Sequence, residues 1–196
     1  MKKIILTIVL AVAATVSANA QLRVEAGINL GNYSIDFSKL STRIAPKVSL
    51  LYSLPEGDMF GTELGLQFAT FNVGNENAGN RSYGSKMSIS DIQIPIREYV
   101  DFRITDKFTI RPGIGTYIGT SVAGTTTRAD GTTASPFGDD GLKRFDFGID
   151  DELAFVFNNH LSISIGSQHC VINRSKSPDV KIKNNAFYLT VGWMFR

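Results

Sequence analysis

Hydrophobic and polar residues alternate along most of the chain after residue 20. The last stretch shows the pattern most clearly, because every second position is apolar: Phe187, Leu189, Val191, Trp193 and Phe195. Successive side chains of a strand point to opposite faces, so this stretch predicts a strand with one wholly apolar face. A closing strand of about ten residues with aromatic side chains near its end is typical of a transmembrane β-barrel.

The same period of two recurs in seven earlier stretches and predicts eight strands in all. They are expected at about residues 21–31, 44–54, 59–73, 92–104, 108–118, 144–157, 161–168 and 185–196. The connections alternate between long loops and short turns; the loops cover about 32–42, 74–86, 121–142 and 173–184, and the turns lie near 56, 106 and 159. An even strand number, short periplasmic turns and longer extracellular loops are typical of outer-membrane barrels. The sequence therefore predicts an all-β, eight-stranded antiparallel up-and-down transmembrane barrel with both termini in the periplasm.

The first twenty residues have the order of a secretory signal peptide. Lys2 and Lys3 precede an apolar run, and Ala18-Asn19-Ala20 supplies an A-x-A cleavage site. The alternative, a membrane anchor, is less favoured because the run is shorter than the roughly twenty residues that a spanning helix needs. We expect residues 1–20 to be the signal peptide, residues 21–196 to be the barrel, and the mature protein to reside in the outer membrane.

The second face of the predicted strands combines glycine with charges of both signs. Glycine suits a crowded interior better than a solvated surface, so we expect these charges to point inward and pair. The alternative is a soluble barrel with an apolar interior that binds a small apolar ligand. The predicted interior charge network consists of Arg23, Glu25, Lys47, Glu63, Arg97, Arg111, Arg144, Asp146, Asp150 and Glu152, with Asp101 and Arg103 on the same face.

The composition of the chain excludes several kinds of partner and site. Formal charge is +2, and loss of Lys2 and Lys3 leaves 2 − 2 = 0, which gives no reason to expect a nucleic-acid partner. The single cysteine, Cys170, excludes an internal disulfide, and two histidines are too few for a multi-histidine zinc site. An eight-stranded barrel is just wide enough for its own side chains to fill. We therefore expect no cofactor, no metal and no catalysis.

Three polar residues are predicted on the apolar, lipid-facing side of the sixth and seventh strands. If the turn at 158–160 sets Phe157 opposite Leu161, then Asp151 lies opposite Ser167, with His169 one step further out. A hydroxyl, an imidazole and a carboxylate together suggest a lipid-modifying enzyme as an alternative function, with His169 as base, Ser167 as nucleophile and Asp151 as orienting group.

A different reading of the lipid-facing carboxylates is contact with a partner. Glu98 also falls on the apolar face, so Glu98 and Asp151 flank the fifth strand, whose Pro112 cannot donate a ladder hydrogen bond. This polar strip predicts a seam for a protein partner or an oligomer. A bulge that turns either carboxylate inward is the alternative.

Several stretches resemble one family of small barrels. Ile92-Gln93-Ile94-Pro95-Ile96 resembles the I-P-L strand of the PorT-like outer-membrane β-barrels of Bacteroidetes-type bacteria, and 111–117 resembles their G-P-x-x-x-Y strand with Pro and Gly reversed. The stretches 146–149 and 189–195 resemble the family's D-x-G-x strand and closing strand. The resemblance implies the same eight-stranded barrel and implies little about activity.

Function is expected to be structural or to lie in the loops, because rigid scaffolds place binding residues on loops. The last loop carries Arg174, Lys176, Lys181 and Lys183 and could meet anionic glycans. The expected partners are outer-membrane lipids and lipopolysaccharide, the barrel-assembly machinery, and a possible surface ligand or protein partner.

Overall fold

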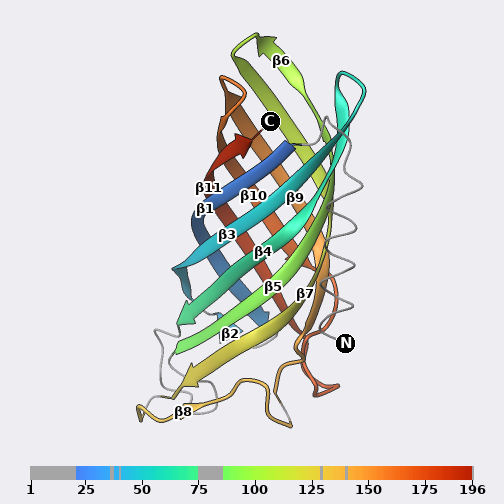
Figure 1. Ribbon diagram of the computed structural model, residues 1–196. Coiled ribbons are helices and arrows are strands. Elements are labelled where there is room, and N and C mark those ends of the chain that lie inside the picture. Colours follow the sequence, from blue (N-terminus) through green and yellow to red (C-terminus); the bar gives the residue numbers. More distant parts are fainter. Residues whose placement is uncertain are drawn as a thin grey trace, which may run out of the picture.

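A computed structural model of the chain describes residues 21–35, 38–39, 41–74, 86–128, 130–139 and 141–195. The predicted signal peptide lies outside these residues. They form a tilted, tall barrel whose strands wind around a common axis (Figure 1). None of the described residues belongs to a helix long and apolar enough to cross a membrane.

Eight long strands make the wall, and every neighbouring pair is antiparallel. Consecutive long strands pair, and β11 returns to pair with β1 from Leu22↔Phe195 to Ile35↔Ile182, which closes the sheet. The predicted eight-stranded antiparallel barrel is confirmed. The long strands are β1 (Gln21–Ile35), β3 (Ser41–Glu56), β4 (Phe60–Gly74), β5 (Lys86–Val100), β7 (Phe108–Thr127), β9 (Phe145–Phe157), β10 (Leu161–Cys170) and β11 (Ile182–Phe195); the short ones are β2 (Ser38–Lys39), β6 (Phe102–Thr105) and β8 (Thr133–Ala134).

The strands run further than the hydrophobic pattern alone indicates. β7 continues to Thr127 through a stretch expected to be loop, and β8 folds back to pair with it. Its Ser, Thr, Val and Gly residues lack a large apolar face, but β-branched Thr and Val suit extended backbone. At the other end, the expected strand 92–104 divides at Asp101 into β5 and β6.

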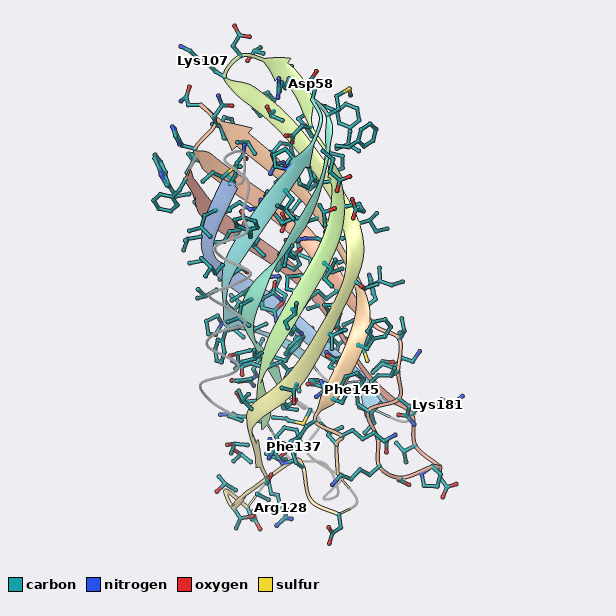
Figure 2. All side chains as sticks on the ribbon, turned by 45° about the vertical axis from the view of Figure 1, so that its right-hand side comes forward. Asp58, Lys107, Arg128, Phe137, Phe145 and Lys181 are labelled. Carbon is teal, nitrogen blue, oxygen red and sulfur yellow. The ribbon has the colours of Figure 1, made fainter. Side chains whose placement is uncertain are left out.

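The apolar face of the barrel points outward. Phe187, Leu189, Val191, Trp193 and Phe195 are between 41% and 52% exposed, whereas the alternating residues of β11 are buried. Figure 2 shows side chains projecting all around the wall, from the turn end marked by Asp58 and Lys107 to the loop end marked by Arg128 and Lys181. A soluble barrel with an apolar ligand cavity would need the opposite orientation, so that alternative is wrong.

A small apolar cluster lies inside the barrel near the loop end. Tyr33 and Phe71 meet edge to face with ring centroids 6.2 Å apart, and Val73, Ile89 and Leu142 pack in the same cluster. Leu142 comes from the loop before β9, so a loop residue helps to close this end of the interior.

Candidate functional site

The interior of the barrel is filled by a network of ion pairs. Two arginines on different strands share the same two carboxylates. Arg23 donates to Glu63 at 2.8 Å and to Glu152 at 2.6 Å, and Arg97 donates to the same two residues at 2.7 Å each. All four side chains are nearly or completely buried. Because the carboxylates bridge the arginines, the centre of the barrel is cross-linked from β1 and β4 to β5 and β9.

Further polar contacts extend this centre toward the loop end. Lys47 Nζ lies over the ring of Tyr188, 3.0 Å from its centroid. The hydroxyl of Tyr188 donates to Asp150 at 3.0 Å and accepts a hydrogen bond from Arg97 at 2.9 Å. Glu25 lies 3.3 Å from Arg23. An aromatic ring and its hydroxyl thus join the charged groups. The alternation of β11 places Tyr188 on the inward face but does not predict this contact.

The structure places nine of the ten residues of the predicted interior network inside the barrel. Arg111, near the turn end, donates to Asp101 at 2.6 Å and 2.8 Å, in a pair separate from the centre. The nine are each at most 7% exposed: Arg23, Glu25, Lys47, Glu63, Arg97, Arg111, Asp146, Asp150 and Glu152.

The prediction that Arg144 points into the interior is wrong. Its side chain is exposed; it donates to the carbonyl of Ser121 at 2.9 Å and lies over the ring of Phe137 at 4.1 Å. Arg144 precedes β9, which begins at Phe145, so strand alternation does not govern its direction. Arg103 is exposed on β6 for a similar reason, because the chain breaks its alternation at Asp101.

A second buried ion-pair group closes the loop end, and it corrects the expectation that Arg174 is available in the exposed basic loop. Arg174 is fully buried although it belongs to a loop; it donates to Ser121 at 2.6 Å and lies 3.4 Å from Asp91 and 3.5 Å from Asp146. Burial opposes its charge, but Tyr33, Asp91 and Asp146 outweigh that effect and raise the pKa of Arg174. Asp91 could have been found, because it lies two residues before inward-facing Gln93; nothing in the loop sequence distinguishes Arg174.

On the outer wall, the structure brings the predicted lipid-facing polar residues together. Ser167 donates to Asp151 at 2.6 Å and lies 2.9 Å from Nε2 of His169. Nδ1 of His169 lies 3.3 Å from Asn185 Oδ1. The Ser167 hydroxyl has one proton, which forms the hydrogen bond to Asp151. The main effect of this arrangement is therefore to supply a hydrogen-bond donor to a carboxylate on an apolar wall.

The two carboxylates of the predicted seam occupy one row of the sheet. Ile114 pairs with Glu98 on one side and with Asp151 on the other, and it is 64% exposed. Glu98 accepts a hydrogen bond from Thr62 at 2.9 Å. Pro112 lies two residues along β7, opposite Leu153. The bulge that would turn these carboxylates inward is absent at both, because Glu98 and Asp151 keep regular register.

Within the described ranges, no three His, Cys, Asp or Glu side chains are placed to hold a metal ion. An apolar outer wall around a filled, charged interior defines the class: a small outer-membrane β-barrel.

Comparison with known proteins gives the family. Residues 4–195 match the Outer membrane protein beta-barrel domain, and the chain belongs to this family, whose description names an architecture and no reaction. The protein is therefore placed in the cell outer membrane. No curated protein sequence matches the chain.

Two solved structures, OprG and neisserial surface protein A, show the same fold at low sequence identity, and Ail gives a weaker match. OprG from Pseudomonas aeruginosa is 15% identical, with a TM-score of 0.55 over 90% of this chain and 95% of that one. Neisserial surface protein A is 10% identical, with a TM-score of 0.51 over 89% and 97%. Ail, the attachment invasion locus protein of Yersinia pestis, is 17% identical, with a TM-score of 0.47 over 90% and 99%.

Proposed function

We propose that this protein is a non-conducting outer-membrane barrel that binds an anionic ligand at the cell surface through its extracellular loops. It works by binding and not by catalysis. The observation that carries the proposal is that two loops form one ordered surface over a closed interior. The signature stretch Ile92-Gln93-Ile94-Pro95-Ile96 supports placement in the PorT-like group of such barrels.

The loops before β9 and before β11 are joined to each other by backbone and side-chain contacts. Lys143 N donates to the carbonyl of Arg174 at 2.6 Å, and a β-bridge links Leu142 to Ser175. Lys176 Nζ reaches back to the carbonyls of Phe137 and Gly138 at 3.1 Å and 2.8 Å. Because binding an ordered surface loses less conformational entropy, this surface suits a specific ligand.

The charge of this surface favours an anionic ligand. Residues 121–144 and 171–183 together contain seven Lys or Arg and four Asp, so their net charge is 7 − 4 = +3. Buried Arg174 is one of the seven and holds the second segment in the barrel mouth. The remaining basic residues are exposed, where they attract a polyanion over about a Debye length.

The test measures binding of dextran sulfate, a simple anionic polymer, to the folded mature protein in neutral detergent. We expect salt-sensitive binding that weakens at least fivefold in the variant Lys176→Gln/Lys181→Gln. The control, Lys107→Gln, removes a cation from the turn end and should bind as the wild type does. Equal binding by all three proteins would contradict the assignment to the loops.

Closure of the interior is tested separately by electrical recording. The purified protein is inserted into planar bilayers at neutral pH, and its current is compared with that of an open porin. We expect no steady single-channel conductance, because ion pairs span the interior from the turn end to the loop end. A reproducible open level would refute a filled barrel.

A second candidate function is lipid hydrolysis at the outer-wall group of Asp151, Ser167 and His169. The observation that favours it is the 2.9 Å contact between Ser167 and Nε2 of His169. The strong hydrogen bond from Ser167 to Asp151 opposes it, since the hydroxyl proton is already engaged. Loss of acyl chains from outer-membrane lipid in vesicles, abolished by Ser167→Ala, would support hydrolysis; unchanged lipid with the wild type would exclude it.

A further inference from the structure

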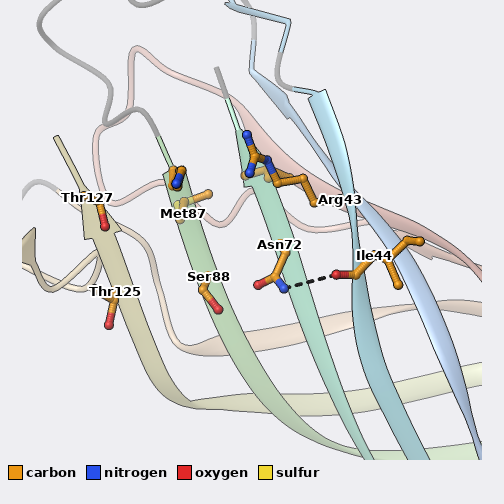
Figure 3. Close-up of a pocket in the computed structure, with 9 residues that line it drawn as sticks. Arg43, Ile44, Asn72, Met87, Ser88, Thr125 and Thr127 are labelled. Atoms are coloured by element: carbon orange, nitrogen blue, oxygen red, sulfur yellow. Dashed lines mark hydrogen bonds between the residues drawn. The ribbon is translucent and has the colours of Figure 1, made fainter. Parts of the chain in front are cut away.

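An outward-facing groove crosses the extracellular ends of four strands, β3, β4, β5 and β7 (Figure 3). Its cavity has a volume of about 450 Å³. One row of the sheet forms its base, because Arg43 pairs with Asn72, Asn72 with Ser88, and Ser88 with Thr125. Lys86 lies one row further toward the loops, on the same face as Ser88. Thr125 and Thr127 belong to residues 121–144, but the two cations of the groove, Arg43 and Lys86, lie outside both loop segments described above.

Irregular pairing at the top of β3 opens this groove. The register between β3 and β4 shifts between Arg43 and Lys47, so the intervening residues do not pair with β4. Asn72 lies beside these residues, and its side-chain amide donates to the carbonyl of Ile44 at 3.3 Å (Figure 3). Gly74 leaves room for the arginine, since a Cβ there would lie 2.6 Å from Arg43 Nε. The guanidinium can therefore lie across the neighbouring strand.

The chemistry of the groove fits an anion. Of its nine described lining residues, Arg43 and Lys86 are cationic and none is acidic. Asn72, Ser88 and Thr125 supply an amide and two hydroxyl groups along one row that crosses β4, β5 and β7. Guanidinium, ammonium and hydroxyl donors converging on one space are the groups that bind phosphate oxygens.

The wall below the groove becomes apolar within two rows. Thr70 and Ser90 pair beneath the polar row, with their hydroxyl oxygens 3.1 Å apart. The next row pairs Phe68 with Ile92, which are 41% and 38% exposed and begin the lipid-facing band. A molecule with an anionic head and apolar chains would contact both the cationic groove and the apolar row below it. A free anion would contact only the groove.

We propose that this groove binds the phosphate-bearing headgroup of an anionic lipid of the outer leaflet. Arg43 and Lys86 hold the phosphate, the amide and hydroxyl row contacts the adjoining polar part, and the acyl chains run along Phe68 and Ile92. The outward direction and the extracellular end of the strands place these cations at headgroup depth. The lipid is thus held at a defined place on the circumference of the barrel.

The test uses native mass spectrometry of the folded protein released from neutral detergent. Diphosphorylated lipid A is the anionic probe, and phosphatidylcholine is the zwitterionic comparison. We expect at least tenfold more bound lipid A than phosphatidylcholine on the wild type, and at least a tenfold loss in Arg43→Gln/Lys86→Gln. The matched control is Arg103→Gln/Lys107→Gln, which removes the same charge from exposed positions at the turn end and should retain lipid A. Heat-dependent gel mobility verifies that each variant is folded.

Three results would overturn the proposal. Unchanged lipid A binding by Arg43→Gln/Lys86→Gln would place the lipid elsewhere. If the wild type retained as much phosphatidylcholine as lipid A, the groove would not select lipids by their negative charge. Displacement of lipid A by an equal concentration of inorganic phosphate would show that the site takes a free anion. We expect the loop substitutions to lower dextran sulfate binding and the groove substitutions to lower lipid A binding. Failure of one proposal can therefore be told from failure of the other.

Discussion

Replacing Arg97 by methionine tests whether the charged interior stabilises the barrel through pairing. Arg97 donates to Glu63 and Glu152 at 2.7 Å each, and methionine keeps much of its length without the charge. Around it, three cations face four carboxylates, namely Arg23, Lys47 and Arg97 with Glu25, Glu63, Asp150 and Glu152. The variant leaves two cations against four carboxylates. Removing one partner of a buried pair costs about 3–5 kcal/mol, so we expect the free energy of unfolding to fall by that amount.

The assay is reversible urea unfolding in lipid vesicles, followed through the single tryptophan, Trp193, which leaves the lipid-facing wall on unfolding. The control Arg103→Met removes an exposed arginine and should change stability by less than about 0.5 kcal/mol. Adding Glu152→Gln to Arg97→Met removes one of the excess negative charges, although Glu152 still meets Arg23, and should restore about half of the loss. A loss below about 1 kcal/mol in the single variant, or no restoration in the double variant, would refute the pairing argument.

Three more predictions concern the wall, the mouth and the seam. Gly115→Val should prevent closure and abolish heat-dependent mobility, because a Cβ at Gly115 would collide with the backbone of Ile96, whereas Gly138→Ala has open space and should fold normally. Arg174→Gln should leave the wall intact but speed tryptic cleavage after Lys176 at least tenfold, since it removes the loop's buried anchor; unchanged cleavage would contradict that anchoring. A photo-crosslinker at Asp151 should give a protein adduct if the seam with Glu98 and Pro112 is real, and adducts with lipid alone would argue against it.

The sequence predicted those parts of the structure that depend on local periodicity. Alternation identified the eight strands and the direction of Arg23, Lys47 and Glu152, because a strand has only two faces. It failed at Arg144, which stands one residue outside a strand and follows loop geometry. It also failed at Arg174, whose burial depends on Asp91 and Asp146 from other strands. Such a contact is decided by tertiary packing and leaves no local pattern.

The outer-wall group of Asp151, Ser167 and His169 also combines contacts that the sequence predicted with one that it did not. The register of the turn at 158–160 correctly set Asp151 opposite Ser167, as the paired strands confirm. The contact to Asn185 on β11 was not anticipated, because β11 is joined to β10 through a loop of unknown geometry. The groove on β3 was hidden for another reason: its irregular register between Arg43 and Lys47 follows from how β3 meets β4.

Closure between β1 and β11 sets the order in which the barrel can form. Its pairs join residues 22–35 to residues 182–195. This edge of β1 therefore has no strand to pair with until residues 182–195 have been synthesised. Until β11 has paired with it, β1 exposes an unpaired edge, and such edges are prone to aggregation. The protein therefore needs protection in transit and completes its wall only as a finished chain. A truncation that removes β1 or β11 would leave the barrel open at this junction.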